Sequence, residues 1–97
     1  MTVEANKQKK HVLTITVSYK SAAWTAKSLR ALADERARSP HLVIEAIVVD
    51  NASGDSPELR RVIDGHGWGD WATLITADRN GGFAYGNNVA FAHAYAL

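Results

Sequence analysis

The stretch from Leu42 to Val49 is apolar at every position except Glu45, and it ends at Asp50. A strand with both faces covered has this composition, because neither face alternates toward solvent. Strands of this kind occur mainly in parallel sheets with helices packed on both sides. This apolar stretch therefore favours an α/β fold over an antiparallel sheet with one solvent-exposed face.

Two further segments read as strands, at 12–17 and 72–76, because both are rich in β-branched and apolar residues. Apolar residues recur at helical spacing from Ser21 to about Ala37, and a short helix is expected at Pro57–Ile63. A last helix is expected to begin near Gly86–Asn88. The order βαβαβα predicts right-handed crossovers and a Rossmann-like parallel sheet.

Composition and charge narrow the class of protein. The chain has 97 residues, of which 46% are hydrophobic, so we expect one folded domain at 11–97 preceded by a disordered tail at 1–10. Its 11 basic and 10 acidic side chains disfavour nucleic acid as a partner. The absence of cysteine excludes disulfides, cysteine-based metal sites and a thiol nucleophile.

No apolar run approaches the roughly 18 residues of a membrane span, and no secretory signal is recognisable. The expected compartment is the cytoplasm, with the inner face of the membrane left open for a longer parent protein.

The last helix is apolar on almost every side, since His93 is its one clearly polar residue beyond Asn88. Such a helix requires burial all round, and neither glycine, a basic turn nor proline ends it before Leu97. We therefore expect the chain to be the first part of a longer domain. An exposed apolar surface would otherwise favour a homo-oligomer.

Ligands of open parallel sheets bind beyond the carboxyl ends of the strands, where the connecting loops converge. Three segments of this chain follow strands, at 18–21, 50–56 and 78–88. They contribute an aromatic side chain, several polar and acidic side chains, and a glycine-rich turn. We expect the three segments to meet at one edge of the sheet and form a ligand site.

The glycine-rich turn departs from the best-known phosphate-binding motifs. Gly81 and Gly86 have the spacing of a Walker A loop, but Asn87 and Asn88 stand where lysine and serine or threonine are needed. No G-x-G-x-x-G follows the first strand, so the dinucleotide fingerprint is also missing. P-loop NTPases and NAD-dependent enzymes are thereby disfavoured.

Taken together, the segments 17–20 (VSYK), 48–55 (VVDNASGD) and 80–88 (NGGFAYGNN) closely resemble the opening of family 2 glycosyltransferases, in particular the rhamnosyltransferase-like branch. The resemblance spans about residues 11–97. It implies the amino-terminal half of a GT-A fold, which binds a UDP- or dTDP-sugar. The parent enzyme would transfer the sugar with inversion to a glycan or lipid-linked acceptor.

The resemblance also implies which residues bind the donor. The expected nucleotide-binding residues are Ser18, Tyr19, Asp50, Asn51 and Asp55. A tyrosine ring can stack on a pyrimidine, and a carboxylate can accept the imide N–H of the base. Many relatives have a second aspartate where this chain has Asn51, so the acceptor of the base N–H stays open. Asp55 has a second interpretation, as a cap of the following helix.

The residues expected near the diphosphate or sugar are Arg79, Asn80, Gly81, Gly82 and Asn88. Arg79 would neutralise phosphate charge, and Asn88 would lie at the start of the last helix. The structural alternative is that the glycines only permit a tight turn and that Asn87 caps the helix.

The resemblance implies that no catalytic residue and no metal ligand lies within 1–97. The Asp-x-Asp element that holds Mg²⁺ or Mn²⁺, and the base that activates the acceptor, would follow later in the enzyme. The chain alone is therefore expected to bind the donor without turnover. The alternative function is a non-catalytic α/β interaction module that self-associates through its edge strand and last helix.

Overall fold

The computed structural model describes residues 9–96. Three parallel strands form one sheet in the order β1-β2-β3. The elements along the chain are β1 (Lys10–Ser18), α2 (Ala22–Arg38), β2 (Leu42–Asp50), α3 (Ser56–Gly65), β3 (Ala72–Thr76) and α4 (Gly82–Ala96). The predicted α/β class, parallel sheet and βαβαβα order are confirmed.

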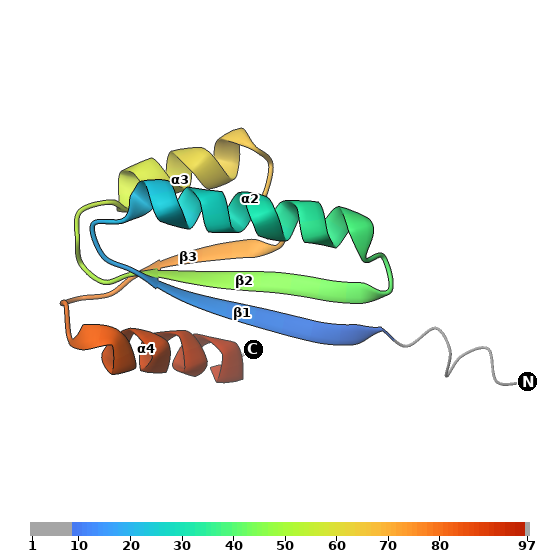
Figure 1. Ribbon diagram of the computed structural model, residues 1–97. Helices are drawn as coiled ribbons and strands as arrows, with labels where there is room; N and C mark the ends of the chain where they lie inside the picture. Colours follow the sequence, from blue (N-terminus) through green and yellow to red (C-terminus); the bar gives the residue numbers. More distant parts are fainter. Residues whose placement is uncertain (1–8, 97) are drawn as a thin grey trace, which may run out of the picture.

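The helices cover both faces of the sheet, with α2 and α3 on one side and α4 on the other (Figure 1). A hydrophobic core lies on each side of the sheet, and alternate residues of β2 pack in one core or the other. Ala46 and Val48 pack among residues of α2 and α3, whereas Ile47 and Val49 pack with Ala90 of α4. The continuous apolar sequence of β2 is thus explained by burial on both faces.

The chain changes from one face of the sheet to the other between β3 and α4, which returns to lie against β1 and β2 (Figure 1). In doubly wound sheets, the carboxyl edge next to such a change of direction is the usual place for a ligand. The fold therefore singles out the edge where β1 and β2 end and α4 begins.

The start of α4 differs from the prediction. The helix begins at Gly82 rather than near Gly86–Asn88. Asn80 Oδ1 accepts the Gly82 N–H at 3.1 Å and so closes the first turn, and Asn87 Nδ2 bonds back to the preceding turn instead of capping. Gly86 lies inside the helix, where a Cβ would stand 2.6 Å from Cγ1 of Val17. Because Gly86 has no side chain, α4 can pack closely on β1.

Smaller differences concern other boundaries. β1 begins at Lys10, which was expected in the tail, and α3 extends to Gly65. The rest of the predicted tail, up to residue 8, lies outside the described residues. Between residues 9 and 96, no helix is long and apolar enough to cross a membrane. The outer face of α4 exposes 44% of Phe91 and 84% of Tyr95.

Candidate functional site

The carboxyl ends of all three strands and the first turns of all three helices lie at one edge of the sheet, which we call the rim (Figure 1). Hydrogen bonds join its loops. The Asn51 N–H donates to the Ser18 carbonyl at 2.8 Å, and the Asn51 side chain donates to the Gly82 carbonyl at 3.1 Å. The predicted meeting of three distant segments is confirmed.

Asp50 organises the loop between β2 and α3. Its carboxylate is fully buried, and Oδ1 accepts the backbone N–H of Ser53 at 3.1 Å and its hydroxyl at 2.6 Å. Oδ2 accepts the Ser56 hydroxyl at 2.7 Å. Burial alone would raise the pKa of Asp50, but the hydrogen bonds from Ser53 and Ser56 outweigh it and hold the pKa below its usual 3.8. Asp50 is therefore ionised at neutral pH, and both of its carboxylate oxygens accept hydrogen bonds from Ser53 and Ser56.

Asn51 carries an acceptor without a partner. The residue is 2% exposed, and Nδ2 donates to Asn80 Oδ1 at 2.9 Å and to the Gly82 carbonyl. Since both partners are acceptors, the orientation of the amide is fixed. Oδ1 is buried and has no hydrogen-bond partner among the described residues. A buried oxygen without a hydrogen bond lowers the stability of the fold by about 1–3 kcal/mol. A ligand that donated a hydrogen bond to Asn51 Oδ1 would remove this cost.

Ser18 is the last residue of β1 and Tyr19 follows it, and the environments of their side chains differ. Ser18 is fully buried, and its Oγ accepts a hydrogen bond from Thr25 at 2.9 Å and lies 3.2 Å from Oγ of Ser21. It fastens β1 to α2. Tyr19 is 43% exposed, and Nζ of Lys20 lies 5.3 Å from its ring centroid. Of the two, Tyr19 has the accessible side chain.

Three other expected residues have distinct positions. Asp55 occupies the N-cap position of α3, but its side chain makes no capping hydrogen bond. Asn88 is exposed within α4, roughly 9 Å beyond the helix start at 1.5 Å per residue, so the structure does not bring it to the loops of the rim. Arg79 is exposed, with Cζ 4.6 Å from the ring centroid of Tyr85.

The glycine-rich turn is a closely packed start of α4. A Cβ at Gly81 would stand 2.5 Å from Cγ of Tyr85, so only glycine fits beside this ring. Gly82 has a φ of +90°, which glycine adopts without strain. Asn80 Oδ1 accepts hydrogen bonds from both Asn51 Nδ2 and the Gly82 N–H. Asn80 thereby ties the end of β2 to α4.

Sequence reasoning missed Ser53, Ser56 and Tyr85. A serine three residues after an aspartate is a turn pattern that could have identified Ser53 as a partner of Asp50. Ser56 and Tyr85 required knowledge of where α3 and α4 begin.

Backbone strain is concentrated at the rim. Among the described residues, the non-glycine residues with left-handed φ are Lys20 at 53° and Ala52 at 62°. One follows β1 and the other follows β2, each next to an expected nucleotide-binding residue. This conformation costs about 1–2 kcal/mol for an L-residue. Strained backbone of this kind clusters at binding and active sites.

Replacing Ala52 with glycine is expected to leave the free energy of unfolding unchanged or raise it by up to about 1 kcal/mol, because relief of the strain exceeds the added entropy of the unfolded chain. The same change at exposed Ala31, inside α2, is expected to lower it by about 1 kcal/mol. Urea denaturation measures both. Equal losses in the two variants would contradict the strained conformation of Ala52.

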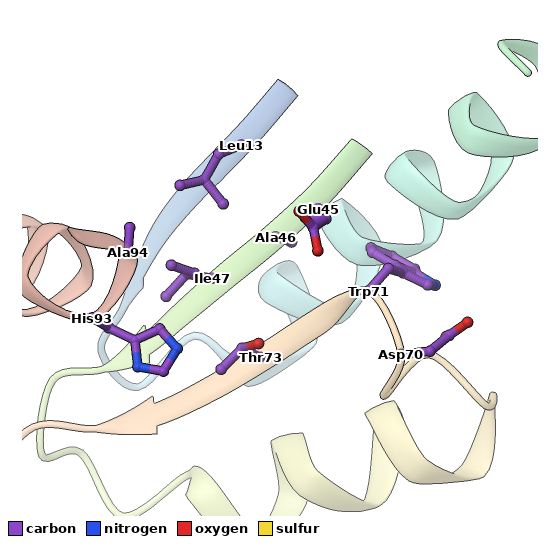
Figure 2. A pocket seen from close by; sticks show the side chains of 9 residues that line it. All are labelled: Leu13, Glu45, Ala46, Ile47, Asp70, Trp71, Thr73, His93 and Ala94. Carbon is purple, nitrogen blue, oxygen red and sulfur yellow. The ribbon is translucent and has the colours of Figure 1, made fainter. Parts of the chain in front are cut away.

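A cavity of about 190 Å³ lies away from the rim, toward the amino ends of the strands. Figure 2 shows Leu13 on β1, Ile47 on β2 and Thr73 on β3, with His93 and Ala94 of α4 beside them. The cavity lies against the sheet, and α4 forms one side of it. Because ligands of this architecture bind at carboxyl edges, and because the unpartnered Asn51 oxygen lies there, we place the candidate site at the rim.

Within residues 9–96, no three side chains of histidine, aspartate or glutamate converge in a way that could hold a metal ion. Comparisons of the chain with protein-family models, with curated proteins and with solved structures found no match.

Proposed function

We propose that the chain is the donor-binding part of a family 2 type glycosyltransferase, the amino-terminal half of a GT-A domain. The observation that carries the proposal is the buried, unpartnered Asn51 Oδ1, which lies at the rim where Asn51 bonds to the carbonyls of Ser18 and Gly82. The three motifs that resemble this family supply the residues of the same rim. The ligand would be a UDP- or dTDP-sugar.

The residues of the rim divide the recognition of the base between them. The Tyr19 ring stacks on the pyrimidine, and Asn51 Oδ1 accepts its imide N–H. Asp50 takes no part in this contact, because its two oxygens already accept hydrogen bonds from Ser53 and Ser56. Uracil and thymine carry the imide N–H, whereas the corresponding ring nitrogen of cytosine is an acceptor. The site would therefore prefer uridine and thymidine nucleotides to cytidine nucleotides.

The reaction of the whole enzyme is transfer of the sugar, with inversion, to a hydroxyl of a glycan or lipid-linked acceptor. Mg²⁺ or Mn²⁺ would supply positive charge to the leaving diphosphate. Its ligands and the base that deprotonates the acceptor belong, in this proposal, to residues outside 1–97. The chain itself binds and orients the donor and is inactive alone.

Calorimetric titration of the folded chain with UDP, dTDP and CDP tests the proposal. UDP and dTDP are expected to bind, with CDP weaker by about tenfold because it leaves Asn51 Oδ1 unpaired. Tyr19→Ala is expected to weaken UDP by about 1–3 kcal/mol through the lost stacking. The absence of binding by all three nucleotides to a folded sample would contradict the proposal.

A second candidate function is a self-associating interaction module. It is favoured by Phe91 and Tyr95, whose rings stack at 6.2 Å on the exposed face of α4. A chain that bound none of the nucleotides and sedimented as a dimer would favour this alternative.

A further inference from the structure

Next to the rim, Asp78, Arg79 and Tyr85 form a small cluster. The Tyr85 hydroxyl donates a hydrogen bond to Asp78 Oδ1, and Cζ of Arg79 lies 4.6 Å from the centroid of the same ring. The hydrogen bond to Asp78 raises the pKa of Tyr85 above its usual 10.0, so the hydroxyl remains a donor at neutral pH. Tyr85 is thus fixed at its tip by Asp78, and its face is occupied by Arg79.

The charge of Arg79 is not neutralised by a carboxylate in the described part of the chain, where the ion pairs join Arg38 to Glu35 and Arg60 to Asp64. The neighbouring carboxylate of Asp78 already accepts from Tyr85. An arginine with unengaged donors is well suited to phosphate, because its planar fork matches two phosphate oxygens. The cation–π contact with Tyr85 limits where the guanidinium can lie.

The cluster stands where the chain enters α4. Gly81 allows the Tyr85 ring to lie against the turn, since a Cβ there would stand 2.5 Å from Cγ of Tyr85. The Gly82 N–H is used by Asn80, but the first turn of α4 still presents the positive end of the helix dipole, which favours an anion. The unpartnered Asn51 oxygen beside the same turn indicates a hydrogen-bond donor on the ligand, which in the proposed function is the base.

We propose that Tyr85 is a positioning residue that holds Arg79 at the rim, where the guanidinium binds the diphosphate of the ligand. This inference rests on the proposed function and adds the residue that positions Arg79 for the phosphates of its ligand. The site would distinguish a nucleoside diphosphate from the nucleoside alone, because Arg79 contributes only when the phosphates are present.

Calorimetry with UDP and with uridine separates the phosphate contribution from the base contribution. Arg79→Gln is expected to reduce the ratio of UDP to uridine affinity by about tenfold or more, the effect of losing one charged hydrogen-bonding group, while uridine binding is unchanged. Tyr85→Leu, which keeps apolar bulk but removes the ring, is expected to reduce the same ratio. Tyr85→Phe retains the ring and is expected to preserve most of it.

The outcomes distinguish this inference from the proposed function. An unchanged ratio in Arg79→Gln or Tyr85→Leu would overturn the inference alone, as would equal losses of UDP and uridine affinity in Tyr85→Leu, which indicate a merely structural role. If the unchanged chain bound neither UDP nor uridine, the proposed function would fail and the inference with it. Circular dichroism of each variant confirms that it is folded, and Arg79→Gln, an exposed substitution, supplies the test should Tyr85→Leu unfold.

Discussion

Replacement of Asp50 with alanine is expected to lower the free energy of unfolding by about 3 kcal/mol. The substitution removes the acceptor of the Ser53 N–H and of the hydroxyls of Ser53 and Ser56, which are half-buried. Hydrogen bonds to a charged group contribute more than neutral ones, and donors left unsatisfied in a half-buried site add to the loss. Urea denaturation followed by tryptophan fluorescence measures the change, because Trp68 and Trp71 are buried in the core.

Two variants control for this prediction. Asp50→Asn keeps an oxygen for Ser53 but presents an amide to Ser56, so a smaller loss of about 1 kcal/mol is expected. Asp70→Ala removes an exposed carboxylate and is expected to change stability by less than about 0.5 kcal/mol. A loss in Asp50→Ala no greater than in Asp70→Ala would contradict the role of Asp50.

The effect of Asp50 should depend on pH in a defined direction. Because its pKa in the folded chain lies below the usual 3.8, the ionised carboxylate stabilises the fold. This contribution is fully present above pH 3.8 and is lost as the pH falls through the folded pKa. The stability difference between the chain and Asp50→Asn is therefore expected to shrink in acid, and a difference that grew in acid would contradict the assignment.

Gly86→Ala is the second large expected effect, with a loss of about 2 kcal/mol. The added methyl would stand 2.6 Å and 2.9 Å from the two γ-carbons of Val17, so α4 must move away from β1. In an ordinary helix the same change is favourable, because alanine has the higher helix propensity. The sign of the effect therefore reports the close approach of α4 to the sheet.

Gly65→Ala, at the end of α3, is the matched control, because an added Cβ there meets nothing within 4 Å. It is expected to be neutral or stabilising by up to about 1 kcal/mol. Val17→Ala should partly rescue Gly86→Ala, since it removes the colliding methyl groups, and the two losses should then be less than additive. Full additivity would contradict direct packing between these residues.

The parts of the fold that follow from local sequence were predictable. The apolar run that forms β2 specifies a strand covered on both faces, and the alternation of strands and helices specifies a parallel sheet. The meeting of the loops after β1, β2 and β3 then follows from topology, because parallel strands end at the same edge. The spacing of apolar residues along the chain was sufficient to predict this topology.

The start of α4 and the roles of Asp50 and Asn51 depend on contacts between distant residues. A glycine cluster reads as a loop unless it is known that Gly86 faces Val17. Likewise, the sequence does not reveal that Ser53 and Ser56 occupy both oxygens of Asp50 while Asn51 is held by Asn80. Local patterns carry no information about which of two adjacent polar side chains keeps a free acceptor.

Titration of the ¹⁵N-labelled chain with UDP, followed by the shifts of its backbone amides, tests the central claim most directly. We expect shifts in the loops 18–21, 50–56 and 78–86, with small changes elsewhere. Shifts confined to the neighbourhood of the cavity at Leu13, Thr73 and His93, or no shifts up to millimolar UDP, would contradict the claim that the rim is a nucleotide site.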